Sequence, residues 1–461
     1  MEAKLDMNKA ITINGAGFVS AGGLFAFRRS LSTRSVAKMS EGGKPYDLLV
    51  YGATGATGKR TAQYLLKNAP PELKWGIAGR SLEKLEHVRE ELRGSVEGGE
   101  ALDIGIVVGS GDTSDEVAKA ARVVATTAGP YSEFGKPLVK ACVENKADYL
   151  DLTGEPNFMR RMIETYGKQA EENNVTVLHG CGFDSIPSDL GVLFLVEEAK
   201  KEFQCGLSGV TTVVEEARGG LGSGTIASIV RAGGDPDSLD PYGLQKDYPE
   251  PEKVTESFPD LFGVQHVPEI DMYGIPFFLS PVNCRVVRRS ASIFASERPT
   301  QSIKINGSDA YCSSRFQYKE FLGLKSKTSA YVGSAIVGGL FVGIGLALKS
   351  STLRDMLYKG IMNNSWKPKE EMVEGGRSKF TLVGKTDEAQ PRTLIAEINM
   401  LDPGYGETSR LLAEASMMVA LEKKELPAHA LGGGFYTPAT GLGTRLLERL
   451  NEKADWIKRV K

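Results

Sequence analysis

Six short apolar runs alternate with longer segments of helical character between Tyr46 and Gly180. The runs read YDLLVYG, KWGIAGR, DIGIVVG, RVVATTAG, DYLDLTG and VTVLHG, and segments such as TGKRTAQYLLKNA and SLEKLEHVREEL separate them. Apolar strands in a parallel sheet are covered by helices on both faces, and a crossover helix joins each strand to the next. The alternation therefore predicts an α/β, doubly wound parallel sheet over residues 45–185.

A glycine-rich loop, YGATGATGKR, follows the first run and carries Gly52, Gly55 and Gly58 at every third position. In a dinucleotide-binding loop the first glycine permits the tight turn, the second lets the backbone approach a pyrophosphate, and the third allows the helix to pack closely. A helix that begins near Thr57 would direct amide donors and its positive dipole toward the phosphates. Together with Thr54, these residues form the nucleotide-binding loop of a predicted Rossmann domain.

The end of the second run indicates which dinucleotide is bound. Enzymes that use NAD carry an acidic residue there for the ribose hydroxyls, whereas this chain has Arg80 and Ser81. Because a guanidinium suits a 2′-phosphate, the sequence favours NADP, although Arg80 could also be a solvated loop charge. Asp112, after the third run, could bond the adenine amino group or cap the helix that starts near Ser114.

Candidate catalytic residues follow the fourth and sixth runs. Ligands of an open α/β sheet lie beyond the carboxyl ends of the strands, which places Gly129 and Pro130 near the nicotinamide. Tyr131 could donate a proton or could be an aromatic side chain packed beside the cofactor. His179 and Asp184 should lie at the same edge, and Asp184 could act in catalysis or cap the next helix.

The pattern changes over residues 186–461. The segments GVTTVVEEA, CRVVRRSAS, SKFTLVGKT and TLIAEINM resemble strands without regular helices between them. They predict a second, α+β domain with a mostly antiparallel sheet. TSRLLAEASMMVALEKKE predicts a helix, and residues 233–268 predict a long loop or lid. Gly224 and Thr225 could contact a substrate carbonyl or form a plain turn.

Residues 328–348 form an unbroken stretch of 21 uncharged residues, with Lys325 and Lys327 before it and Lys349 and Arg354 after it. The stretch is long enough to span a bilayer core. The stretch could form a buried helix. An interfacial or membrane-inserted hairpin is favoured, because an exposed apolar surface of this size would otherwise promote aggregation. A full crossing is the least favoured alternative, since the residues that follow look like part of the same globular protein.

Composition and residue spacing argue against nucleic acid as a partner and against a disulfide framework or a metal site. The formal net charge of -2 gives no broad basic surface for nucleic acid. The five cysteines form no CxxC pair and the four histidines are dispersed, so no disulfide framework and no metal site are predicted.

Residues 1–44 have a different composition from the rest of the chain. From Met7 to Ser40 they lack Asp and Glu but contain several basic residues and hydroxyls. This composition is typical of an organelle transit peptide, for a mitochondrion or a plastid, and a disordered extension without targeting function is the alternative.

The motifs GATGATG, AGPYSEFGKPLVKACVENKADYLDLTGEPNF, GFDSIPSDLG, GSGTIAS and GGGFYTPATGLG together resemble the saccharopine dehydrogenase-like oxidoreductase family. The resemblance covers nearly all of the chain after residue 45. It implies an N-terminal NADP-binding domain, a second domain for substrate and association, and membership of a lipid-associated branch. That branch includes bacterial trans-acting enoyl reductases of complex-lipid and glycolipid biosynthesis. It implies no particular catalytic residues.

The leading hypothesis is an NADPH-dependent reductase that acts on a hydrophobic, lipid-like substrate at a membrane or lipid-droplet surface. A membrane-associated protein that binds NADP(H) without turnover is the main alternative, and a saccharopine dehydrogenase is a third. A homodimer is compatible with each of them.

Overall fold

The computed structural model describes residues 43–219, 226–228, 230, 243–245, 263–295, 312–363 and 370–461. Residues 1–42 of the predicted targeting segment lie outside this range. So do Gly224, Thr225 and most of the predicted loop over residues 233–268.

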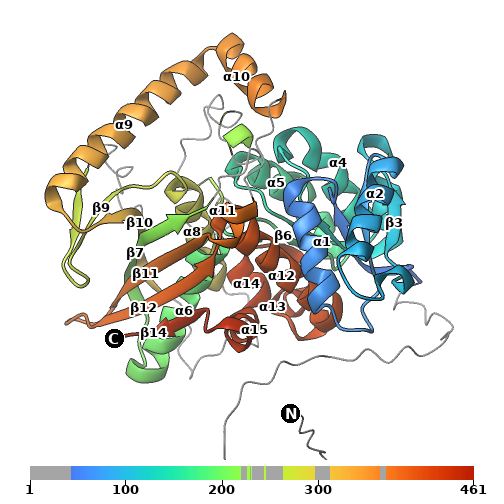
Figure 1. The fold of residues 1–461 in the computed structure, drawn as a ribbon. Coiled ribbons are helices and arrows are strands. Elements are labelled where there is room, and N and C mark those ends of the chain that lie inside the picture. Colours follow the sequence, from blue (N-terminus) through green and yellow to red (C-terminus); the bar gives the residue numbers. More distant parts are fainter. Residues whose placement is uncertain are drawn as a thin grey trace, which may run out of the picture. The chain divides into compact units, whose positions relative to one another are not determined.

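Seven parallel strands form the first sheet, in the order β13-β6-β5-β4-β1-β2-β3. Of these strands, β3 and β6 are labelled in Figure 1. The prediction of a doubly wound Rossmann sheet is confirmed, because its six predicted strands are all present in the expected arrangement. Their bounds are β1 Tyr46–Tyr51, β2 Trp75–Gly79, β3 Gly105–Val108, β4 Ala121–Thr126, β5 Asp148–Asp151, β6 Thr176–Leu178 and β13 Gly434–Tyr436.

Helices cover both faces of this sheet, as the apolar strands require. In β1, Leu48 and Val50 pack into the core that contains Leu65 of α1, whereas Leu49 between them packs with Tyr149 into the core beneath α4 and α5. A strand buried on both faces reads as a continuous apolar run rather than an alternating one. The helices are α1 Ala56–Asn68, α2 Leu82–Gly94, α3 Ser114–Ala120, α4 Tyr131–Glu144, α5 Pro156–Glu172 and α6 Ile186–Phe203.

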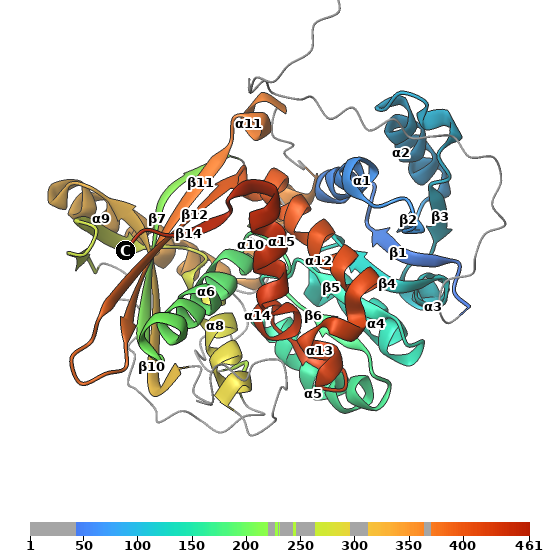
Figure 2. The same ribbon diagram turned by 90° about the horizontal axis from the view of Figure 1, so that it is seen from below.

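The seventh strand, β13, comes from the predicted second domain, residues 186–461. It pairs with β6 in the register Gly434↔Thr176 and so covers what would otherwise be an open edge. The helix α12 (Thr408–Glu422) also returns to the first sheet and packs beside α1 (Figure 2). The boundary after residue 185 therefore leaves out C-terminal elements of the nucleotide-binding sheet, because β13 lies in a glycine-rich segment with the composition of a loop.

The second sheet has the order β14-β12-β11-β7-β10-β9-β8, and among its described pairs only β7 and β10 run parallel. The prediction of a mostly antiparallel sheet is confirmed. Its strands are β7 Leu207–Arg218, β8 Gln265–Val267, β9 Met272–Pro276, β10 Cys312–Leu324, β11 Arg377–Thr386, β12 Thr393–Leu401 and β14 Ile457–Arg459.

One predicted strand of this region is wrong. CRVVRRSAS lies in α8 (Ser280–Ala295), which packs with α6 against the second sheet. Cys284, Val287, Ala291 and Phe294 all contribute to one core at spacings of three and four residues, and this is the period of a helix. The sequence RVVRR predicts a strand because valine favours strands. The contacts that make the segment helical are with residues distant in the sequence, so the local pattern does not reveal them.

The uncharged stretch forms α9 (Lys327–Lys349), followed after a bend by α10 (Ser351–Asn363), the two orange helices in Figure 1. The most apolar 18-residue window of α9 is only 17% buried, so the helix is not the buried core helix that was one alternative. Its length and composition alone would suffice to cross a membrane. The remaining helices are α11 Glu370–Glu374, α13 Pro427–Ala430, α14 Pro438–Leu442 and α15 Thr444–Ala454.

Candidate functional site

A cavity of about 410 Å³ lies where the carboxyl edge of the first sheet meets segments attached to the second sheet. One wall is the start of α1, a second comes from the segments that follow β4, β5 and β6, and a third comes from residues before and within α8 and α12. The lining residues used below are Gly55, Thr57, Gly58, Thr127, Gly129, Tyr131, Leu152, Gly154, Phe183, Asp184, Ser228, Phe277, Phe278, Leu279, Val282, Tyr405 and Thr408.

The glycine loop has the geometry of a dinucleotide cradle. Gly52 has a φ of +84°, a conformation that favours glycine. A Cβ on Gly58 would lie 2.4 Å from the Gly52 carbonyl oxygen and 2.6 Å from Thr127 Oγ1, so no side chain fits there. The helix α1 has Gly55 as its N-cap, with no capping side chain and no acidic residue in the first turn. Its first amide groups are therefore directed at the cavity without a side-chain competitor, and they fit a pyrophosphate.

The predicted contacts to the adenosine end lie outside the cavity lining. Arg80 is exposed directly after β2. Burial raises the pKa of the Tyr51 phenol, and the nearby Arg80 charge opposes that rise. The guanidinium therefore lies near the end of β1, beside the glycine loop, where a 2′-phosphate would be bound in this fold. Thr54, the other predicted loop residue, is exposed.

Ser81 and Asp112 have different local roles. The Ser81 hydroxyl caps α2, where it accepts a hydrogen bond from the Lys84 amide at 3.4 Å. Asp112 is exposed in the short turn before α3. Ser110 and Thr113 make the capping hydrogen bonds of that turn, so the capping interpretation of Asp112 is wrong. Both Ser81 and Asp112 lie after strands on the side of the sheet expected to hold the adenosine.

Tyr131 lines the cavity but is packed in place. Its hydroxyl donates to the Thr126 carbonyl at 3.0 Å and accepts from the Leu152 amide at 3.2 Å. Burial raises the pKa of the phenol well above its ordinary value. The structure therefore favours the packed-aromatic interpretation over proton donation. Gly129 also lines the cavity, and Pro130, joined to it by a cis peptide bond, is the N-cap of α4.

His179 lies behind the cavity wall, not in it. Its side chain is 5% exposed, and Nδ1 is 2.7 Å from Oδ2 of the fully buried Asp151. Tyr149, Phe158 and Phe435 surround the imidazole ring. The pair joins the ends of two neighbouring strands, and His179 is not positioned to protonate a molecule in the cavity. Asp151 was not predicted as its partner, although DYLDLTG and VTVLHG are consecutive predicted strands.

Of the three candidate catalytic residues, Asp184 is the one whose position in the cavity fits a proton donor best. It lines the cavity, and no described residue donates a hydrogen bond to its carboxylate. Burial raises the pKa of Asp184 to about 6. Ser185, rather than Asp184, is the N-cap of α6, and the helix has no side-chain capping bond there, so the capping alternative is wrong. A carboxyl group with this pKa can hold and release a proton near neutrality.

The apolar wall of the cavity was not predicted. Phe277, Phe278, Leu279 and Val282 come from the segment that enters α8, and Tyr405 precedes α12. The only available signal was the apolar sequence GIPFFLSPV, which follows a strand and does not indicate by itself which surface it faces.

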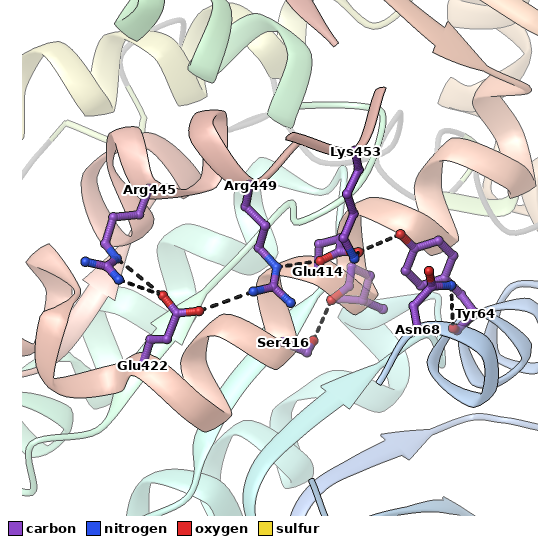
Figure 3. Close-up of polar contacts among 9 residues, drawn as sticks. Tyr64, Asn68, Glu414, Ser416, Glu422, Arg445, Arg449 and Lys453 are labelled. Atoms are coloured by element: carbon purple, nitrogen blue, oxygen red, sulfur yellow. Dashed lines mark hydrogen bonds and ion pairs between the residues drawn. The ribbon is translucent and has the colours of Figure 1, made fainter. Parts of the chain in front are cut away.

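The C-terminal helices hold the cofactor helix α1 (Figure 3). Glu414 of α12 accepts hydrogen bonds from Tyr64 of α1, from Arg449 and from Lys453, each at 2.5 Å. Burial alone would raise the pKa of Glu414, but the three donors outweigh it and lower the pKa. Ser409 also donates to the Thr57 carbonyl at 3.2 Å, so α12 contacts α1 near the cavity as well as farther along the helix.

Within the described residues, no group of three or more His, Cys, Asp and Glu side chains is arranged to hold a metal ion. The polar chemistry of the cavity therefore rests on the glycine loop, hydroxyls and Asp184.

Comparison with known proteins agrees with this site. Residues 48–178 match the saccharopine dehydrogenase NADP-binding domain, which confirms the prediction of NADP. A Mycobacterium tuberculosis protein named for trans-acting enoyl reductase activity is 35% identical over 422 residues, covering 88% of this chain and 96% of that protein. The trans-acting enoyl reductase of Mycobacterium ulcerans is 31% identical over 435 residues, covering 89% of this chain and 97% of its own.

Among solved structures, the L-Glu-forming saccharopine dehydrogenase of Saccharomyces cerevisiae aligns with 90% of this chain and 99% of its own, at 12% identity and a TM-score of 0.44. The identity to the mycobacterial proteins extends through both sheets. The chain is thus an NADP-binding oxidoreductase that belongs to the saccharopine dehydrogenase-like oxidoreductase family, together with the trans-acting enoyl reductases.

Proposed function

We propose that this oxidoreductase uses NADPH to reduce an activated double bond of an apolar, lipid-like substrate at a membrane or lipid-droplet surface. The observation that carries the proposal is the composition of one cavity. It brings together the start of α1, an apolar wall around Phe277 and Phe278, and the Asp184 carboxyl group.

The chain's own residues have separate roles in this reaction. The amide groups at the start of α1 bind the pyrophosphate, and Arg80 binds the 2′-phosphate. Bound NADPH supplies the hydride. Asp184 holds the proton that the reduced substrate requires, and Gly154 leaves room for it, because a Cβ there would be 3.3 Å from Asp184 Oδ2.

The apolar wall favours a hydrophobic substrate. Phe277 and Leu279 are almost fully buried, and both line the cavity. An acyl chain placed against them would remove apolar surface from water at about 25 cal/mol per Å².

The names of the relatives favour a double bond over a carbonyl as the reduced group. Reduction of a conjugated double bond requires a hydride at one carbon and a proton at its neighbour. The cavity offers Asp184 for the proton, whereas the described lining contains no Lys, Arg or His to stabilise an alkoxide.

The proposed location at a membrane or lipid-droplet surface rests on α9 and α10. Their exposed apolar side chains lie beside Lys325, Lys327, Lys349 and Arg354, which can meet anionic head groups. β11 follows the helices and pairs with β7, which precedes them, so a membrane crossing would separate two hydrogen-bonded strands. An interfacial position keeps the sheet intact. The exposed apolar residues are Tyr331, Val332, Ile336, Leu340, Val342, Ile344, Leu346, Met356 and Leu357.

Contacts connect this helical pair with the cavity. Ala227 and Val230 pack with Leu348 of α9 and Tyr358 of α10, and Ser228 between them lines the cavity. Tyr358 also donates to Glu133 of α4 at 2.7 Å. A substrate that leaves a lipid surface at α9 and α10 would therefore start close to the site. Residence in an organelle, mitochondrion or plastid, is part of the same proposal.

The test is oxidation of NADPH by the purified protein with and without a lipid extract from its source. We expect lipid-dependent oxidation and a product heavier by two hydrogens, and we expect Asp184→Asn to bind NADPH but lose turnover. Tight NADPH binding without oxidation in any extract would favour the alternative of a non-catalytic NADP-binding protein. Reduction of NADP with saccharopine would instead favour a saccharopine dehydrogenase.

A further inference from the structure

A second buried carboxyl group lies behind Asp184. Glu320 of β10 is 1% exposed. One of its oxygens accepts from Ser188 of α6 at 2.7 Å, and the other accepts from the Asn283 amide of α8 at 2.8 Å. The Tyr318 hydroxyl adds a longer contact at 3.4 Å. Three different elements therefore supply hydrogen bonds to a carboxyl group that does not line the cavity.

This network reaches the segment that carries Asp184. Asn283 donates to Glu320 and accepts a hydrogen bond from Ser185 at 3.4 Å. Ser185 is the residue after Asp184, and Val282, the residue before Asn283, lines the cavity. Glu320 thus connects, through Asn283, the segment that carries Asp184 and the start of α8, both of which line the cavity.

Charge also couples the two carboxyl groups. Burial raises the pKa of Glu320 to about 7, and the Asp184 charge contributes to the rise. Of the ionisable groups that face Glu320 in the described residues, Tyr318 and Cys284 both have a raised pKa and stay neutral in this range. Neither is basic. Because coupling is reciprocal, an ionised Glu320 must also oppose ionisation of Asp184, and the pair loses its two protons in separate steps.

We propose that Glu320 is a positioning residue of the reductase, which directs Asp184 toward the cavity through Asn283 and Ser185. This inference rests on the proposed function. In the reaction, the O–H bond of Asp184 breaks as a C–H bond forms on the substrate carbon beside the one that receives the hydride. The resulting carboxylate regains its proton from solvent. Glu320 touches neither substrate nor cofactor.

The test is kcat and KM for Glu320→Ala, measured below pH 6, where Asp184 still holds its proton. Asn283 loses its acceptor in this variant, so kcat should fall by roughly tenfold or more because Asp184 is no longer held in place. Glu320→Gln keeps an amide oxygen for Asn283 and should recover most of the loss. NADPH affinity should not change in either variant.

Ser188→Ala provides a milder test. It removes the hydrogen bond to one oxygen of Glu320 and leaves the Asn283 bond to the other, so kcat should fall less than in Glu320→Ala. The matched control is Asp189→Asn, one residue along α6, whose buried carboxylate accepts from Ser290 at 2.5 Å and from the Ala439 amide at 2.8 Å. That variant should lower thermal stability without lowering kcat. The proposal is overturned if Glu320→Ala and Ser188→Ala both leave kcat unchanged, or if Asp189→Asn lowers it equally.

A readout that does not depend on turnover separates this proposal from the proposed function. Carboxyl stretching bands of the NADP-bound protein, followed by infrared titration, should show the Glu320 step at lower pH in Asp184→Asn than in wild type, because the Asp184 charge then no longer raises the pKa of Glu320. Coupled titration without any lipid turnover would leave the carboxyl pair intact and contradict only the reductase. Independent titration of the two carboxyl groups would contradict the pair.

Discussion

Gly58 lies directly against the Gly52 carbonyl, so closely that a Cβ on Gly58 would be 2.4 Å from that oxygen. The first and third glycines of the loop thus fix each other's position, and the second, Gly55, is left as the N-cap between them.

Gly58→Ala should weaken NADPH binding by at least tenfold. The added methyl group must displace either the Gly52 carbonyl or Thr127, and overpacking of this kind costs about 1–3 kcal/mol. Fluorescence titration with NADPH measures the effect. Gly94→Ala is the control, since a Cβ at Gly94 meets nothing within 4 Å; equal affinities of the two variants would contradict the predicted cradle.

Arg80→Ala should weaken NADPH binding by about 1–3 kcal/mol more than NADH binding, because only NADPH offers a 2′-phosphate for charge-assisted hydrogen bonds. Parallel titrations with both nucleotides provide the comparison. Lys67→Ala, an exposed change in the last turn of α1, should alter neither affinity. A similar loss for both nucleotides would remove Arg80 from the phosphate site.

Asp184→Asn should be inactive yet more stable than wild type above pH 6. Because the pKa of Asp184 is raised to about 6, the folded protein binds more protons than the unfolded chain between about pH 4 and pH 6. The free energy of unfolding of the wild type therefore falls as pH rises through that range. The Asn variant has no proton to lose at this position, so its stability does not fall for this reason. Urea unfolding at pH 4 and pH 8 should show a stabilisation of about 1–2 kcal/mol at pH 8 only, after allowance for solvent in the cavity. A variant that is no more stable at pH 8 would show that Asp184 ionises without cost.

Glu414→Gln should destabilise the protein by about 2–4 kcal/mol, because Arg449 and Lys453 lose the partner of a buried ion pair. NADPH affinity should fall as well, since Tyr64 of α1 then donates to a neutral amide oxygen of α12 instead of a carboxylate. Chemical unfolding and nucleotide titration measure the two effects. Glu422→Gln, whose partners lie at the more exposed end of the same cluster, should cost less than half as much. An unchanged affinity in a destabilised Glu414→Gln would show that α12 is not needed to hold the nucleotide loop.

Replacing Ile336 and Leu340 together by Glu should release the protein from lipid vesicles without unfolding it. The two side chains are 65% and 61% exposed on α9, so their replacement removes apolar contact with lipid but little core packing. Flotation with vesicles of neutral and anionic phospholipid measures binding. Leu82→Glu is the control, because Leu82 is 52% exposed on α2, away from α9 and α10. Retained flotation of the double variant would contradict an interfacial role for α9.

Six strands of the first sheet could be predicted from sequence because each is marked by a local pattern and is followed by a helical segment. The glycine loop was interpretable for the same reason: its three glycines are neighbours in sequence as well as in space. β13 could not be predicted, since it lies in the glycine-rich segment GGGFYTPATGLG and its partner, β6, is distant in sequence. The helix α8 was misread because its apolar positions face two different cores, and Val286 and Val287 belong to different ones.

The candidate site was only partly accessible to sequence reasoning. Strand order placed Tyr131, His179 and Asp184 at one edge of the sheet but did not indicate which side chain faces the cavity. That choice depends on long-range contacts. Tyr131 is held by main-chain groups of two strands, His179 is turned toward Asp151, and only Asp184 is left facing the cavity without a hydrogen-bond donor among the described residues. The apolar wall and Glu320 belong to the second sheet's part of the chain, which carries no nucleotide-binding motif.

The pairing of β13 with β6 also has a consequence for biosynthesis. On the ribosome, β1 to β6 emerge long before residues 434–436, and at about 5–20 residues per second the delay is on the order of tens of seconds. During that interval the edge of β6 has no strand partner and α1 lacks α12. The nascent nucleotide-binding sheet therefore stays incomplete until nearly the whole chain has been translated, and it should need a chaperone to protect that edge.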